Sequence, residues 1–216
     1  YRMQYPDLIF PIYQTENQYS KGVSISATYN WPRSRGKYIS MCEGDDYWTD
    51  TYKLQKQIDF LEKNPSYSGC AHRYKSLKNG SIKTTNIDNV KNTLTVEDLA
   101  HRIPFQTATF IFRKELLKIP LEYAPYISSY FIFMLLAEQG NIYFMNDYMS
   151  VHRVHDGGVY SGLNPMQQVE KSVESKYHRI KYFKARNKKV AKIEKKINAA
   201  QAELDTLNAS IIENDA

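Results

Sequence analysis

The sequence predicts an α/β fold, in which a mixed β-sheet is flanked by helices and followed by a long C-terminal helix. Three observations lead to this prediction. Short apolar runs alternate with amphipathic segments through the first half, turn residues separate them, and glycine no longer occurs beyond about Asn164. The chain has 216 residues, 42% of them hydrophobic, which is enough to bury a large core. We therefore expect a globular domain over residues 1–162 and a helix over residues 163–216.

The expected strands are short apolar runs bounded by turn residues. They cover residues 8–13, 37–42, 67–71, 105–112, 142–145 and 149–154. The pair Asn79-Gly80 is a strong turn signal and predicts a reversal of the chain after the third run.

The expected helices lie between these strands. One ends near Asn30, before Trp31-Pro32. In residues 53–63 three apolar side chains recur at helical spacing with Gln and Lys between them, which predicts an amphipathic helix; they are Leu54, Ile58 and Leu61. Thr95 and Asp98 resemble the start of a capped helix. Residues 130–139 predict a buried helix that is closed by a C-terminal glycine, Gly140.

The net charge of +6 is concentrated in one segment. Residues 171–196 contain eleven Lys or Arg and two acids, so this segment carries +9 and the rest of the chain −3. A basic helix of this kind is either a solvated surface or a contact to an anionic membrane. Nucleic acid is not an expected partner, because no recognition motif accompanies the charge.

The last part of the chain has a heptad pattern. Apolar residues stand at positions 190, 193, 197, 200, 204, 207 and 211. Such a seam predicts a homodimer through residues 190–211, with a helix that folds back onto its own domain as the alternative.

The two cysteines, Cys42 and Cys70, lie in apolar runs and predict buried, reduced thiols. No apolar run approaches the ~18 residues of a membrane span, and no signal peptide is visible. We expect a cytoplasmic protein in which residues 171–196 form a solvated helix face. The alternative is peripheral contact of this segment with the inner face of the membrane. Because the chain starts at Tyr1 rather than Met, we also expect sequence to precede it.

The strongest chemical signal is the acidic cluster Glu43-Gly44-Asp45-Asp46, directly after the strand expected at residues 37–42. Crowded carboxylates repel one another, and a divalent cation removes this penalty. Mg²⁺ and Mn²⁺ favour carboxylate oxygens and share substrate phosphates, and ligands bind at strand ends in open α/β sheets. The cluster therefore predicts a cation held against a diphosphate. The alternative is a solvated acidic turn before the helix at Lys53.

A second signal is His155, which follows the last expected strand and precedes Gly157-Gly158. Neutral imidazole is a common metal ligand, and glycines let the backbone approach a phosphate. The alternative is a surface loop with an incidental histidine. Arg153 is expected to pair with phosphate or with the acidic cluster, whereas His152 is interpreted as an ordinary strand residue.

Residues 37–50 and 53–57, with the acidic cluster at their centre, closely resemble the middle of bacterial family 2 glycosyltransferases of the GT-A fold. The likeness extends to residues 16–22, 136–140 and 149–159, and covers roughly residues 5–162. It implies a partial GT-A-like fold. It also implies an inverting transfer of a sugar from a nucleotide-diphosphate donor, which in this family is usually a UDP-sugar. The implied acceptor is a glycan or a lipid-linked acceptor of cell-surface polysaccharide synthesis.

The resemblance also implies roles for individual residues. A Mn²⁺ or Mg²⁺ ion would be held by Asp45, Asp46 and His155. The donor would be contacted by Glu43, Asp45, Arg153, Gly157 and Gly158. The acceptor would be contacted by Trp48 and by the segment 105–109, including Thr107.

Two departures from the family stand out. The general base is normally an Asp, and its expected position here is Ser129, whose hydroxyl is not a base at neutral pH without help. The family's first two strands, which grip the base and ribose, are also missing from the sequence. The alternative function is therefore a catalytically impaired relative that binds a sugar or nucleotide.

Overall fold

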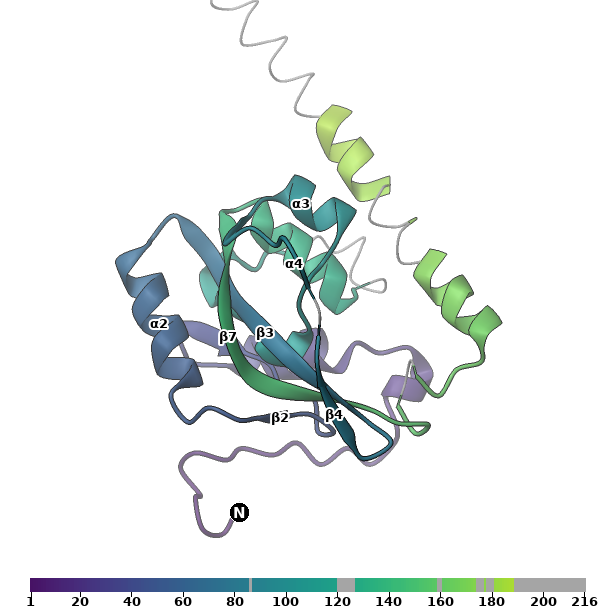
Figure 1. Ribbon diagram of the computed structural model, residues 1–216. Helices are drawn as coiled ribbons and strands as arrows, with labels where there is room; N and C mark the ends of the chain where they lie inside the picture. The colour runs from purple at the N-terminus through teal and green to yellow at the C-terminus, as the bar shows by residue number, and fades with distance from the viewer. Residues whose placement is uncertain (86, 120–126, 159–160, 174–176, 178–180, 189–216) are drawn as a thin grey trace, which may run out of the picture. The chain divides into compact units, whose positions relative to one another are not determined.

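The computed structural model describes residues 1–85, 87–119, 127–158, 161–173, 177 and 181–188. The chain divides into two compact units, Tyr1–Asn164 and Pro165–Ala216 (Figure 1). In the second unit, residues 165–173 and 181–188 are helical. The heptad seam at 190–211 lies outside the described residues, as does part of the basic segment 171–196. No helix in the described ranges is long and apolar enough to cross a membrane.

The first unit is built on a mixed seven-stranded sheet, which confirms the predicted fold class. Five strands follow the order β1-β6-β3-β7-β2, while β4 pairs with β3 and β5 with β7. The strands are β1 (Tyr38–Ser40), β2 (Tyr47–Trp48), β3 (Tyr67–Lys78), β4 (Ser81–Thr84), β5 (Thr93–Leu94), β6 (Ile111–Arg113) and β7 (Asn141–Val154). The long central pair β3–β7 is parallel, and all other pairs are antiparallel.

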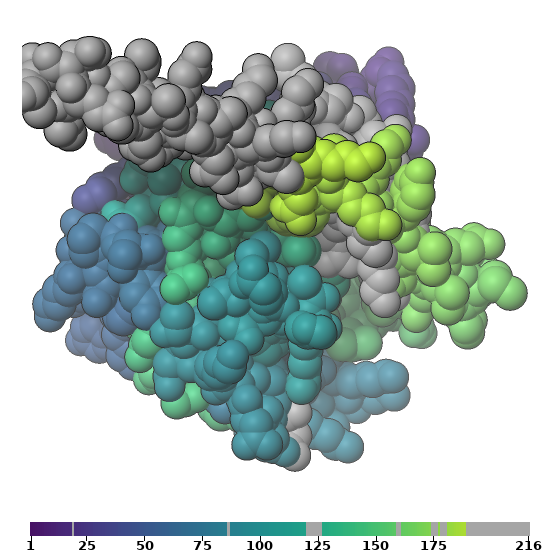
Figure 2. Space-filling view, turned by 90° about the horizontal axis from the view of Figure 1, so that it is seen from above, coloured from purple at the N-terminus to yellow at the C-terminus, as the bar shows by residue number. Residues whose placement is uncertain are grey.

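The main helices cover opposite faces of this sheet. The two main helices are α2 (Lys53–Lys63) and α4 (Ser129–Ala137). Two shorter helices, α1 (Trp31–Arg33) and α3 (Val96–His101), are also present. On β7, Tyr143 stacks on Phe60 of α2 at 3.8 Å between ring centroids, whereas its neighbour Phe144 lies near Phe105, which contacts Phe133 of α4. Successive side chains of a strand point to opposite faces, so α2 and α4 lie on different sides. In Figure 2 the segment around α3, in teal, lies in front, with α2, in blue, beside it.

Short helical turns complete the first unit. They are η1 (Tyr19–Lys21), the π-helical η2 (Ser26–Asn30), and the 3₁₀ turns η3 (Thr107–Thr109) and η4 (Lys114–Leu116). The helix expected to end near Asn30 is followed directly by α1, which extends to Arg33. Pro32 is tolerated because it lies in the first turn of α1, where the N–H that proline lacks is not needed.

Several local predictions are confirmed. Helix α2 has the predicted bounds, and α3 begins with a capping box in which Thr95 and Asp98 exchange hydrogen bonds. The turn between β3 and β4 is formed by Asn79 and Gly80, both with positive φ (50° and 76°). These values suit a two-residue hairpin turn.

Other expectations were wrong. Residues 8–13 form no strand, and most of 105–112 is not extended, because η3 interrupts it before the short β6. Residues 142–145 and 149–154 belong to one strand, β7, which bulges between them where it pairs with β3. Cys42 is exposed, while Cys70 is buried as expected.

The buried face of α2 also differs from the prediction. Its buried side chains are Lys53, Gln57 and Leu61, whereas Leu54 is exposed. Gly140 has no positive φ and does not close α4 as a left-handed cap. A Cβ at Gly140 would lie 2.5 Å from the carbonyl oxygen of Ser66, so close packing explains this glycine.

Candidate functional site

The acidic cluster lies in the turn between β1 and β2, beside the end of β7. Strand β2 pairs with β7 so that Trp48 is opposite Ser150 and Tyr47 opposite Val151. One step further along this antiparallel register, Asp46 meets His152. The pairing therefore joins the cluster to a segment 106 residues later in the chain.

Asp46 is held entirely by protein groups. Its side chain is 3% exposed. Both carboxylate oxygens lie 3.2 Å from Nδ1 of His152, and Oδ1 accepts the backbone N–H of Arg153 at 2.9 Å. The hydrogen bond to Asp46 raises the pKa of His152, and partial burial opposes this rise. Asp46 thus fixes the end of β7 to the acidic turn.

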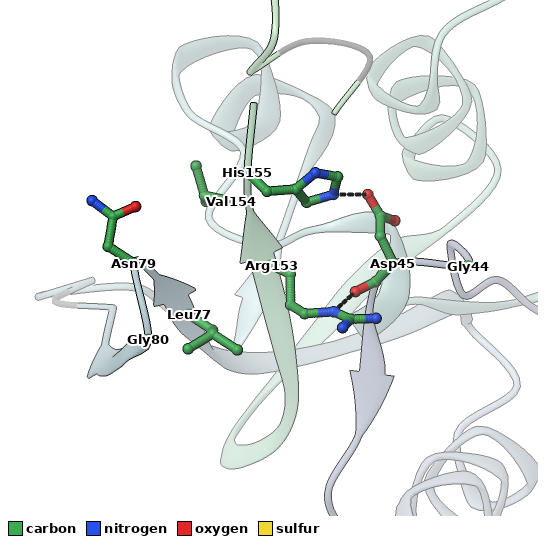
Figure 3. Close-up of a pocket in the computed structure, with 8 residues that line it drawn as sticks. All are labelled: Gly44, Asp45, Leu77, Asn79, Gly80, Arg153, Val154 and His155. Carbon is green, nitrogen blue, oxygen red and sulfur yellow. Dashed lines mark hydrogen bonds and ion pairs between the residues drawn. The ribbon is translucent and has the colours of Figure 1, made fainter. Parts of the chain in front are cut away.

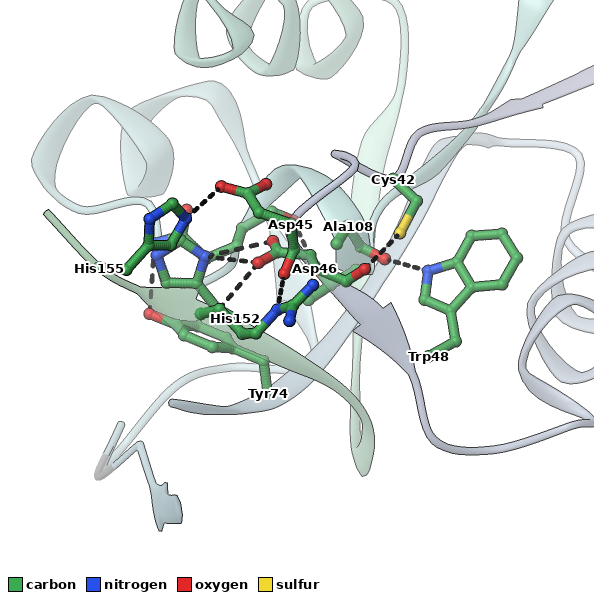
Figure 4. Close-up of polar contacts among 11 residues, drawn as sticks. Cys42, Asp45, Asp46, Trp48, Tyr74, Ala108, His152 and His155 are labelled. Carbon is green, nitrogen blue, oxygen red and sulfur yellow. Dashed lines mark hydrogen bonds and ion pairs between the residues drawn. The ribbon is translucent and has the colours of Figure 1, made fainter. Parts of the chain in front are cut away.

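Asp45 has the same kind of partner in an open setting (Figure 4). Its Oδ2 lies 3.1 Å from Nε2 of His155, and the two side chains are 42% and 46% exposed. Arg153 donates from Nε to the Asp45 carbonyl, and its guanidinium lies 5.9 Å from the ring centroid of Tyr47. Asp45, His155 and Arg153 therefore present accessible polar and charged side chains at one place.

These three residues line a pocket of about 490 Å³ (Figure 3). The rest of its lining is Gly44, Leu77, Asn79, Gly80 and Val154. The pocket thus lies between the acidic turn, the end of β7 and the tip of the β3–β4 hairpin. Its size is within the range of small-molecule sites.

The predicted acceptor residues Trp48 and Thr107 lie on the other side of the cluster. Trp48 donates from Nε1 to the carbonyl of Ala108 at 2.9 Å, which ties its indole to η3. Thr107 lies in the same turn. Loss of hydration raises the pKa of Glu43, and the Thr107 hydrogen bond opposes the shift. Phe105 was wrongly included in this segment, because it is buried in the core against Phe110 and Phe133.

A buried polar group under Trp48 was missed from the sequence. Lys53 is 1% exposed, donates to Gln57 at 2.9 Å and places Nζ 4.4 Å from the centroid of the Trp48 ring. Burial lowers its pKa to about 8. Nearby on β3, burial lowers the pKa of His72 to about 3, so this histidine is neutral. The spacing of Lys53, Gln57 and Leu61, four residues apart on one helix face, was the signal that could have revealed Lys53.

The role of His152 was also missed from the sequence, although His152 directly precedes the pocket-lining Arg153 on β7. No feature of the sequence distinguished it from a strand residue. The register of β2 against β7 alone could have done so, because it aligns His152 with Asp46.

The accessible groups suit a divalent cation only in part. Carboxylate oxygen and imidazole nitrogen at Asp45 and His155 are suitable ligands for Mn²⁺. Within the described ranges, no three His, Cys, Asp or Glu side chains are grouped so that they could hold a metal ion. Asp46 already accepts hydrogen bonds from His152 and Arg153. Asp45 and His155 therefore offer two possible ligands. A cation completed by phosphate oxygens and waters stays a prediction, as does the participation of Asp46.

The remaining predicted positions lie outside the pocket. The N–H of Gly158 donates to the carbonyl of His155 at 3.1 Å, so Gly157 and Gly158 belong to the tight turn after β7. Contact of these glycines with phosphate stays a prediction. Ser129 is the first residue of α4, and the preceding Ser128 caps this helix by accepting the N–H of Phe131.

Comparisons with known proteins found both sequence relatives and structural neighbours. No family model matches the chain. It is 28% identical over 166 residues to the uncharacterized proteins Rv1520 of Mycobacterium tuberculosis and Mb1547 of Mycobacterium bovis, covering 74% of this chain and 46% of each relative. The chain thus spans about half the length of the curated relatives it matches.

Solved structures of S. aureus TarS are similar at 15% identity. The 1–349 form matches with a TM-score of 0.41 over 58% of this chain and 38% of TarS. The same form in complex with UDP-GlcNAc matches with a TM-score of 0.43 over 69% and 47%.

Proposed function

We propose that this chain contributes to the catalytic domain of a nucleotide-sugar-dependent glycosyltransferase. The observation that supports this most directly is the convergence of Asp45, Arg153 and His155 on one pocket, from segments 110 residues apart. The likeness of residues 37–57 to family 2 glycosyltransferases supports the same function.

In this proposal the donor diphosphate lies at the open end of the cluster. Arg153 supplies a permanent positive charge, and its guanidinium suits hydrogen bonding to phosphate oxygens. Asp45 and His155 would hold Mn²⁺ or Mg²⁺, which when bound neutralises the charge that develops on the leaving diphosphate. Asp46 keeps the turn and the end of β7 together. The acceptor approaches from the side of Trp48 and Thr107, which suits an inverting reaction.

The test is calorimetric titration of UDP with Mn²⁺ into the full-length protein and into Asp45→Ala. We expect the substitution to weaken binding at least about tenfold, since it removes one ligand of the cation that bridges to the diphosphate. Asp147→Ala is the matched control, because Asp147 is an exposed carboxylate whose ion pair is with Lys56. Metal-independent binding that survives Asp45→Ala would sink the proposal.

A second candidate is a relative that binds the donor without turnover, favoured by Ser129 at the expected position of the base. Incubation with UDP-sugars and Mn²⁺ separates the two functions. Hydrolysis or transfer that disappears in Asp45→Ala excludes the binding-only function, whereas donor binding with no turnover for any donor and acceptor supports it.

A further inference from the structure

The tip of the β3–β4 hairpin is fixed beside the charged end of the pocket. Strand β3 keeps its parallel pairing with β7 to its last residue, with Leu77 opposite Arg153 and Lys78 opposite Val154. The hairpin then reverses through Asn79 and Gly80, whose positive φ values define a tight turn. Leu77 is thus held by two ladders of backbone hydrogen bonds, and Asn79 lies in the tight turn that closes the hairpin directly after them.

The pocket has two chemically different halves (Figure 3). One half, which we call the charged half, holds Asp45, Arg153 and the imidazole of His155, while the hairpin tip supplies a neutral half with the Leu77 side chain and the Asn79 amide. The lining is completed by Gly44, Gly80 and Val154. An inorganic phosphate needs only the charged half. A ligand that uses both halves carries an anionic group joined to a neutral ring with polar substituents.

We propose that the hairpin tip binds the hydroxylated ring that the phosphate carries. Leu77 packs against the carbon face of this ring, and the Asn79 amide, with two donors and one acceptor oxygen, hydrogen-bonds its hydroxyl groups. The identity of the anion rests on the proposed function, whereas the role of the hairpin rests on the geometry of its tip. The ring is either the ribose of the nucleotide or the transferred sugar, and both have the same chemistry.

The test compares three classes of probe on the full-length protein with Mn²⁺: pyrophosphate, UDP, and a set of UDP-sugars (glucose, galactose and N-acetylglucosamine). The main variants are Asn79→Gly, which keeps the positive φ of the turn, and Leu77→Ala. Lys83→Ala, on exposed β4 of the same hairpin, is the matched control. Circular dichroism of each variant establishes that the hairpin variants are folded.

We expect Asn79→Gly and Leu77→Ala to bind UDP or a UDP-sugar about five- to tenfold more weakly, with pyrophosphate binding unchanged, because each loses one hydrogen bond or one apolar contact. A loss already present with UDP identifies the ribose, and a loss confined to UDP-sugars identifies the transferred sugar. Unchanged affinity for every probe, or an equal loss for pyrophosphate, overturns the role of the hairpin. If the unaltered protein binds none of the probes, the proposed function itself fails and the inference with it.

Discussion

Two histidine–aspartate pairs stand next to each other at the end of β7, and they differ mainly in burial. His152 and Asp46 lie 3.2 Å apart with the carboxylate 3% exposed, while His155 and Asp45 lie 3.1 Å apart with the carboxylate 42% exposed. The backbone of β7 also binds Asp46, but not the Asp45 carboxylate. The same two residue types thus serve architecture in one pair and remain available to a ligand in the other.

The reason for the difference is the position of each aspartate relative to the β2–β7 ladder. Asp46 directly precedes Tyr47, the first paired residue of β2, and so continues the register onto β7. Asp45 lies one residue earlier, in the turn before the ladder begins. Its carboxylate is therefore outside the β2–β7 pairing, and Asp45 lines the pocket.

Among the substitutions that test this comparison, Asp46→Ala is expected to have the largest effect on stability. Removing a buried carboxylate leaves the N–H of Arg153 and the imidazole of His152 without their acceptor. We expect the free energy of unfolding to fall by about 2–4 kcal/mol. Urea denaturation measures it, and a loss no greater than that of Asp45→Ala would contradict the architectural role of Asp46.

A smaller effect is expected at the other buried charge, Lys53, which has a cation–π contact but no ion-pair partner among the described residues. Replacing a buried, uncompensated ion with an apolar side chain is often stabilising, so Lys53→Met should raise the free energy of unfolding by about 1 kcal/mol at pH 7. Lys56→Met on the exposed face of α2 is the control.

The pH dependence sharpens this prediction. Because the folded-state pKa of Lys53 is lowered to about 8 from 10.5, the unfolded chain binds more protons between these values. The stability of the unaltered protein therefore gains a contribution as pH rises from about 8 towards 10.5, and the advantage of Lys53→Met shrinks there. An advantage that is constant from pH 7 to pH 10 would show that the pKa of Lys53 is not lowered in its buried site.

The ion pair of His152 should contribute less, under about 1 kcal/mol, because the imidazole is partly exposed. Its pKa is raised above 6.5 in the folded state, so the contribution is complete below pH 6.5 and is lost as pH rises through the folded-state pKa. Unfolding of the unaltered protein and of His152→Asn, measured from pH 5 to pH 9, checks this. The difference between them should decrease with pH; an increase would contradict the pairing with Asp46.

The smallest effect on stability is expected for Asp45→Ala and His155→Ala, each within about 0.5 kcal/mol, because both side chains are substantially exposed. The same urea denaturation measures it. A loss above 2 kcal/mol for either variant would place this pair with the architectural one and remove the contrast.

The sequence by itself determined the features that depend on neighbouring residues. The bounds of α2 follow from its composition and from Asn64-Pro65, the start of α3 from Thr95 and Asp98, and the hairpin turn from Asn79-Gly80. The acidic cluster was predicted directly after a strand. It lies in the turn between β1 and β2, although β1 ends two residues earlier than expected, at Ser40.

Only the tertiary structure decided which side of each element is buried and which distant residues meet. It placed Lys53 rather than Leu54 inside, made His152 the partner of Asp46, and required a glycine at position 140 because Ser66 approaches it. Helical or strand spacing defines a set of faces but not which one a neighbouring strand will cover. That choice depends on pairings such as β2 with β7, whose residues lie about a hundred positions apart.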